Sequence, residues 1–167
     1  MKEIKRLDKS AQEAYRKLKE TVMNALPDKA WLIPFTEEVE ERMFDADSPL
    51  LVYGYFVDGT LAAVSSLDTD LEEFREIAVS AGMPTEKKGG ELGGSMVLPA
   101  YRGQNLMREI NSVLMSEARN QGFFYLVATA HPDNIASNTS LSKLGLSYKK
   151  TIVRTGGYLR NVYGMEL

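Results

Sequence analysis

The chain has 167 residues, 44% of them hydrophobic and 26% charged, which is the composition of one globular domain spanning residues 1–167. The absence of cysteine excludes disulfide bonds, thiolate metal sites and a cysteine nucleophile, and the net charge of −3 argues against nucleic-acid binding. No stretch approaches the ~20 apolar residues of a membrane span, and the charged N-terminus has no apolar run behind it, so we expect a cytoplasmic protein without membrane contact.

Hydrophobic spacing and turn residues divide the first half of the chain into strands and helices. Apolar residues at helical intervals follow Ser10–Glu13, which is typical of a capping box, and stop at Pro27. Asp58 and Gly59 are typical of a two-residue hairpin turn. The predicted elements are a strand at 4–7, helices at 11–26 and 36–44, strands at 50–57 and 61–67, and a helix at 71–81.

The second half alternates strands and helices. A strand at 91–98 precedes a polar loop and an amphipathic helix that stops near Gly122. The run 123–130 is apolar throughout, which is typical of a strand buried on both faces of a parallel sheet. The remaining elements are a short helix between His131–Asn134 and Gly145, and strands at 146–153 and 158–167. This order predicts an α/β fold with one right-handed crossover between parallel neighbours.

The loop after the strand at 91–98 is the most informative stretch of the chain. Pro99 ends the strand, and residues 102–107 supply backbone N–H groups before the next helix has formed its own hydrogen bonds. Such N–H groups favour an anion together with the positive end of the helix dipole, and Arg102 adds a charge. The G-x-G-x-x-G and G-K-[ST] spacings of the common nucleotide loops are absent.

Residues 97–107 read V-L-P-A-Y-R-G-Q-N-L-M. This segment resembles the V-x-P-x-Y-R-G and [QR]-x-x-G-x-[GA] patterns of the GNAT superfamily of N-acetyltransferases, with Asn105 and Met107 in place of small residues. Asn tolerates the left-handed conformation that Gly would adopt at that point. A second segment, N-I-A-S at 134–137 followed by L-S-K-L-G-L at 141–146, is similar to the family pattern N-x-x-[AS]-x-x-L-Y-x-K-x-G-F.

The resemblance implies a strongly twisted mixed sheet of about seven strands flanked by helices, with splayed parallel central strands that admit the pantetheine arm of acetyl-CoA. It implies acetyl-CoA as the co-substrate and no metal. An N–H near Met96 or Val97 would polarise the thioester carbonyl, whereas Asn134 could equally be a plain helix cap. The residues implied for the cofactor site are Met96, Val97, Arg102, Gly103, Gln104, Asn105, Leu106, Met107, Asn134, Ser137 and Asn138.

Direct transfer in a ternary complex is the simplest mechanism, because the chain has no cysteine to form an acyl-enzyme. Glu91 is the predicted catalytic base, since some family members have a catalytic Glu at this position; the alternative is an exposed charge at a strand end. His131, the single histidine, is the second candidate. Leu141 stands where the family usually has a general-acid Tyr. Tyr148, Tyr158, Tyr163 or a water would have to replace it, unless the thiolate leaves unaided.

The charges are unevenly distributed along the chain. Residues 36–91 have four Lys or Arg and fourteen Asp or Glu, whereas residues 92–165 have eight and three. We expect an anionic cofactor on the basic half and a cationic amine, small molecule or peptide, on the acidic segment, where Glu72, Glu73 and Glu76 lie. The long connection at 69–90 is either part of the acceptor pocket or a surface helix. The alternatives to an N-acetyltransferase are a non-catalytic acyl-CoA sensor and an interaction module of the same fold.

Overall fold

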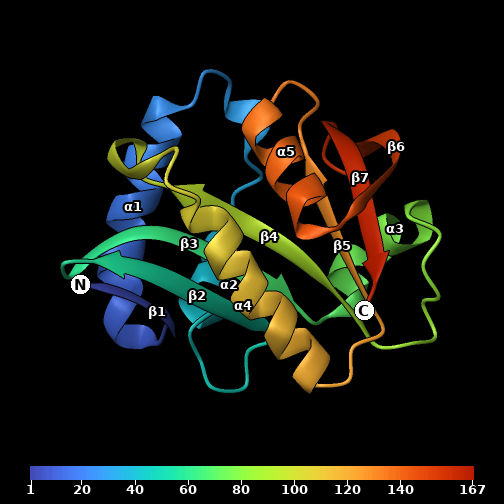
Figure 1. Cartoon of the computed structure of the whole chain (residues 1–167), viewed down its shortest axis with the longest axis horizontal. Helices are drawn as coiled ribbons and strands as arrows, with labels where there is room; N and C mark the ends of the chain where they lie inside the picture. The colour runs from blue at the N-terminus through green and yellow to red at the C-terminus, as the bar shows by residue number, and fades with distance from the viewer.

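The computed structural model describes residues 1–167 and contains one seven-stranded sheet in the order β1-β2-β3-β4-β5-β7-β6 (Figure 1). All neighbouring strands are antiparallel except β4 and β5, which are parallel. The predicted mixed fold is therefore confirmed. The strands are β1 (Lys2–Arg6), β2 (Leu50–Val57), β3 (Thr60–Asp68), β4 (Gly89–Val97), β5 (Tyr125–Ala130), β6 (Ser147–Arg154) and β7 (Tyr158–Glu166).

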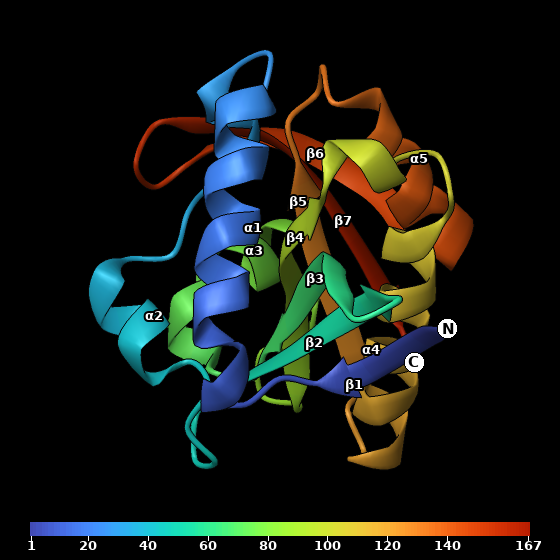
Figure 2. The ribbon, with the colours of Figure 1, turned by 90° about the vertical axis from the view of Figure 1, so that its left-hand side faces the viewer.

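Five α-helices cover the two faces of the sheet, and none is long and apolar enough to cross a membrane. Two of them, α4 and α5, lie on one face, and the other three lie on the opposite face (Figures 1 and 2). The helices are α1 (Gln12–Ala25), α2 (Glu37–Arg42), α3 (Leu71–Ser80), α4 (Leu106–Asn120) and α5 (Ile135–Leu144). Short 3-10 helices precede α1, α2 and α4, at η1 (Lys9–Ala11), η2 (Lys29–Trp31) and η3 (Pro99–Tyr101).

The turn chemistry of the first half is partly as predicted. Asp58 and Gly59 both have positive φ, 49° and 81°, as the two-residue hairpin between β2 and β3 requires. The capping box at Ser10 was wrong. Asp8 accepts the N–H of Ser10 at 2.9 Å and so begins η1, and α1 starts only at Gln12 with no side-chain cap.

The central strands β4 and β5 are paired only along the first part of β4. β5 pairs with β4 from Gly89 to Leu92 only, so the edge of β4 beyond Leu92 is open on that side. The register between β3 and β4 shifts opposite Ser65, and Gly94 in this bulge has a φ of +59°. A Cβ on Gly94 would lie 2.8 Å from Cε2 of Phe35. The bulge therefore bends β4 away from β5 and needs glycine both for its backbone and for the close approach of Phe35.

Candidate active site

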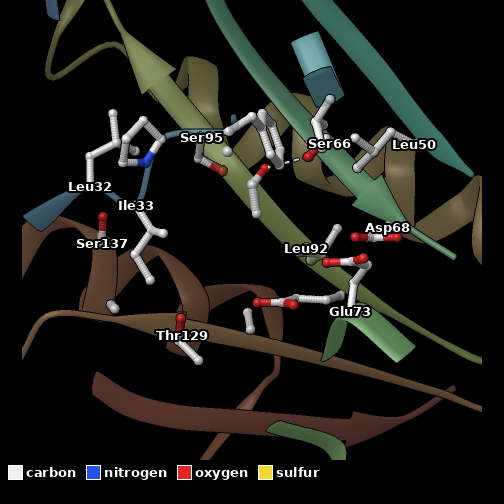
Figure 3. A pocket seen from close by; sticks show the side chains of 18 of the residues that line it. Leu32, Ile33, Leu50, Ser66, Asp68, Glu73, Leu92, Ser95, Thr129 and Ser137 are labelled. Carbon is white, nitrogen blue, oxygen red and sulfur yellow. Dashed lines mark hydrogen bonds between the residues drawn. The ribbon is translucent and has the colours of Figure 1, made fainter. Parts of the chain in front are cut away.

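A cavity of about 730 Å³ opens where β4 and β5 separate (Figure 3). One part of its wall comes from α4 and α5, through residues such as Met107 and Ser137. The other part comes from the segment between α1 and α2, from the start of α3, and from the C-terminal ends of β3 and β6. Residues far apart in the sequence therefore meet around one space that reaches both faces of the sheet.

The loop before α4 provides an anion cradle of unpaired amides. The N–H groups of Gly103, Gln104, Asn105, Leu106, Met107 and Arg108 donate to no atom of the chain, and the first helical bond is from Glu109 to Asn105. Arg102 was expected to contribute its amide, but that N–H already donates to Pro99 O at 3.3 Å. Asn105 adopts the left-handed conformation with a φ of 64°, as Asn in the place of Gly suggested.

The open edge of β4 favours Val97 over Met96 as a backbone donor. Leu98 N–H donates to Ala62 O of β3 at 2.8 Å. Successive backbone N–H groups of a strand point to opposite edges, so the Val97 N–H points away from β3, toward the open side, and the Met96 N–H does not. The Met96 side chain is buried in the core between α1 and the sheet. The sequence had left these two residues as alternatives.

The N-terminal part of α5 contributes polar groups to the cavity wall. Asn134 caps α5 by accepting the Ser137 N–H at 3.2 Å, and both residues line the cavity. Ser140 also lines the cavity, and its buried Oγ has no partner in the chain. That orphaned hydroxyl fits a ligand with amide groups, because a buried polar atom left unpaired costs free energy.

Asn138 was predicted as a cofactor ligand, but its side-chain amide is fully used inside the protein. Its Nδ2 donates to His131 O at 2.9 Å and to Asn134 O at 2.8 Å. Its Oδ1 accepts from Asn161 at 2.9 Å and from Tyr163 at 2.6 Å. An Asn amide has two donors and two acceptor positions, so none is free for the pantetheine arm. Asn138 instead fastens the start of α5 to β7.

A bidentate ion pair in the cavity wall joins Arg154, at the end of β6, to Glu91 of β4. Arg154 donates from Nη1 to Glu91 Oε1 at 2.7 Å and from Nη2 to Glu91 Oε2 at 3.0 Å. The sequence predicts Glu91 as the catalytic base, and the structure does place it in the cavity wall, 8% exposed. Both of its oxygens are nevertheless committed to Arg154.

Asp68, which the sequence analysis did not select, is a second carboxylate at the same place. It stands directly opposite Glu91 in the pairing of β3 with β4. Burial, opposed by the N–H of Asp70 and assisted by the charges of Glu91, Glu73 and Asp70, raises the pKa of Asp68 to about 7. Figure 3 shows the carboxylates of Asp68 and Glu73 beside one another in the cavity. No motif marked Asp68, because its pKa depends on neighbours brought in by folding.

None of the tyrosines considered as a general acid lies in the cavity wall. Tyr163 donates to Asn138, and Tyr148 is bonded to Thr151 at 2.8 Å. His131 stacks on Trp31 with ring centroids 6.2 Å apart and does not line the cavity. Leu141, at the position of the missing Tyr, is buried in the wall.

The remaining wall combines apolar and acidic groups. The segment 31–35, W-L-I-P-F, lines the cavity next to α5. Of the three glutamates expected to attract the acceptor, only Glu73 lines it. Glu72 pairs with Arg75 on the surface of α3 at 2.6 Å, and Glu76 accepts the Thr155 N–H at 3.2 Å. The connection at 69–90 therefore contributes to the cavity through the start of α3.

Comparison with known proteins agrees with this geometry. The model of the acetyltransferase (GNAT) family matches residues 8–145. The structure of a probable acetyltransferase from Staphylococcus epidermidis superimposes with a TM-score of 0.76 at 16% identity, over 99% of both chains. The ribosomal-protein-S18-alanine N-acetyltransferase of Escherichia coli gives 0.71 at 17% identity, over 99% of this chain and 94% of that one.

A third similar structure contains the expected cofactor. The ribosomal L7/L12 alpha-N-protein acetyltransferase RimL in complex with coenzyme A gives a TM-score of 0.72 at 16% identity, over 99% of this chain and 94% of that one. Among curated protein sequences, none matches the chain. At such identities the structural likeness shows the fold alone, whereas the family model covers most of the chain, including the first predicted motif and all but the last residue of the second. The chain therefore belongs to the GNAT family of acetyltransferases.

Proposed function

We propose that the protein is an N-acetyltransferase that transfers the acetyl group of acetyl-CoA directly to a primary amine. The observation that supports this most is a cavity whose lining includes Met107 of the anion cradle together with the carboxylates of Asp68, Glu73 and Glu91. The cradle fits a pyrophosphate, and the open β4 edge with the orphaned Ser140 hydroxyl fits the amides of a pantetheine arm. The carboxylates fit the protonated form of an amine.

Acetyl-CoA supplies the acyl group and a thiolate leaving group when it is bound. Gly103–Arg108 would hold its pyrophosphate, and the Val97 N–H would donate to the thioester carbonyl, where negative charge would develop during transfer. Asp68 accepts a proton from the ammonium group, which frees the nitrogen lone pair to form the new N–C bond as the C–S bond breaks. Glu91 and Glu73 raise the proton affinity of Asp68 for this task.

The second proton of the amine passes to the sulfur, so that coenzyme A leaves as the free thiol. A thiol titrates near ~8.5, so the thiolate departs without a strong acid and then takes up this proton. Ser137 and Ser140 are the hydroxyl groups of α5 in the cavity wall, and they can pass that proton. The replacement of the usual Tyr by Leu141 is then compatible with turnover.

The cofactor assignment predicts a thermal shift. Acetyl-CoA at about 100 times its dissociation constant should raise the free energy of unfolding by about 2.7 kcal/mol, which corresponds to roughly 5–10 °C for a chain of this size. Arg102→Ala should weaken binding by removing a charge beside the cradle, and Arg119→Ala, an exposed arginine at the far end of α4, is the matched control. Absence of a shift at millimolar acetyl-CoA would contradict the assignment.

A non-catalytic acyl-CoA sensor is the second candidate, and the missing Tyr at Leu141 favours it. Thiol release from acetyl-CoA in the presence of a panel of amines distinguishes the two. Because the chain has no cysteine, a thiol-reactive dye reports only coenzyme A. Cofactor binding without thiol release above the rate of spontaneous hydrolysis would favour the sensor.

A further inference from the structure

Arg160 is a buried cation in the cavity wall without a counter-charge. It is 2% exposed, and its guanidinium donates from Nη1 to Leu159 O at 2.7 Å and from Nη2 to Ala30 O at 2.8 Å. No carboxylate forms a salt bridge with it, and Glu91, which lines the same cavity, is paired with Arg154. A guanidinium has five N–H donors, so three of them have no acceptor in the chain.

The strand geometry places Arg160 on the acceptor side of the sheet. Its neighbour Asn161 bonds to Asn138 of α5. Successive side chains of a strand point to opposite faces, so Arg160 points to the face covered by α1, where it meets Ala30 of η2. The cofactor cradle at the start of α4 lies on the other face, with α5. A phosphate of coenzyme A is therefore not the counter-charge of Arg160.

The guanidinium of Arg160 contacts two carbonyl oxygens and the ring of Tyr158, whose centroid lies 5.3 Å from Cζ, but no anion. Holding Ala30 O needs one neutral donor, whereas burying a full charge against carbonyl dipoles is costly unless an anion completes the site. Burial and the charge of Arg154 lower the pKa of Arg160, which shows the same lack of a compensating anion. The lining of the same cavity also includes the apolar side chains of Trp31 and Ile33.

We propose that the acceptor is an apolar amino acid with a free carboxylate, and that Arg160 binds this carboxylate while the amine faces Asp68. The inference rests on the proposed function and specifies its substrate class. The apolar side chain would contact the segment 31–35. The carboxylate of the zwitterion would pair with Arg160 and its ammonium group with Asp68. Arg160 is then a specificity-determining residue.

The test compares acceptors that differ only in the carboxylate. Leucine, methionine and phenylalanine are each assayed as free acid, as amide and as decarboxylated amine, by thiol release at saturating acetyl-CoA. The free acid should have the higher kcat/KM, by about 10- to 100-fold over the amide, the usual range for a charge-assisted hydrogen-bonded pair. The amide has the less basic and therefore more readily deprotonated amine, so amine chemistry alone would give the opposite order.

The variants assign the preference to one side chain. Arg160→Gln should bring the acid-to-amide ratio of kcat/KM close to one, Arg160→Lys should restore part of it, and the exposed Arg119→Gln should leave it unchanged. Equal rates on acid and amide in the wild-type protein would overturn this inference. Arg42 also lines the cavity, and loss of the preference in Arg42→Gln rather than Arg160→Gln would overturn it as well. Acetyl-CoA binding without thiol release from any acceptor would instead overturn the proposed function. The comparison of acid with amide in the wild-type protein tests the preference for a carboxylate even if Arg160→Gln does not fold.

Discussion

Asp68→Asn is expected to lower kcat/KM by about 10²–10⁴-fold, the usual contribution of a general base. Asp68 must be deprotonated to accept a proton, and its pKa is raised to about 7, so the wild-type kcat/KM should rise with pH through a limb near 7. Asp68→Asn should abolish that limb. The acceptor's own amine titrates identically in all variants, so the difference between profiles isolates the protein group.

The Glu91→Gln variant distinguishes the role of Glu91 from that of Asp68. It removes one charge that raises the pKa of Asp68 and releases Arg154 from its ion pair, so the limb should move to lower pH instead of disappearing. Glu72→Gln, on the exposed face of α3, is the matched control and should change neither rate nor profile. If Glu91→Gln loses the limb while Asp68→Asn retains it, the base is Glu91.

The same pKa affects stability. Because the pKa of Asp68 is higher in the folded chain than its ordinary 3.8, the folded state holds the proton more tightly. The contribution of Asp68 to the free energy of unfolding is fully present below pH ~4 and is lost as the pH rises through about 7. Asp68→Asn should remove this dependence, which melting temperatures measured across that interval would show.

Gly94→Ala should destabilise the fold by about 2–5 kcal/mol. An L-residue in the left-handed region costs about 1–2 kcal/mol, and the new Cβ would lie 2.8 Å from Phe35, which adds an overpacking cost of about 1–3 kcal/mol. Denaturant unfolding measures the loss. Acetyl-CoA affinity should fall as well, because the bulge opens the β4 edge.

Gly93→Ala is the matched control for Gly94→Ala. It is the adjacent residue of β4, its φ is not positive, and a Cβ there would meet nothing within 4 Å. Its free energy of unfolding should stay close to that of the wild type. An equal loss in both variants would mean that the bulge conformation has no special requirement for glycine at Gly94.

The sequence predicts most of the elements and the backbone of the loop before α4, because both depend on local patterns. The hairpin turn at Asp58 and Gly59, the helix ends at Asn134 and Gly145, and the left-handed Asn105 all follow from short-range backbone preferences. The unpaired amides before α4 follow from the same logic, since any helix start leaves its first donors free.

The acceptor side is not predicted because its groups come together only through tertiary structure. Asp68 has an ordinary setting in the sequence, and its raised pKa comes first from burial and then from the charges of Glu91 and Glu73, which folding brings close. Arg160 looks like one more strand-surface charge until the η2 segment covers it. Asn138 fits the family pattern, yet Asn161 and Tyr163 occupy its amide.

The position of β7 inside the sheet has a consequence for biosynthesis. β7 lies between β5 and β6, which do not pair with each other. β6 pairs only with β7, and β5 pairs with β7 along one of its two edges. During translation, residues 125–130 and 147–154 therefore leave the ribosome with unsatisfied edges until residues 158–166 emerge and insert between them. A nascent chain stalled before Tyr158 would expose two strand edges with unpaired N–H and C=O groups, and we expect chaperones to bind it preferentially.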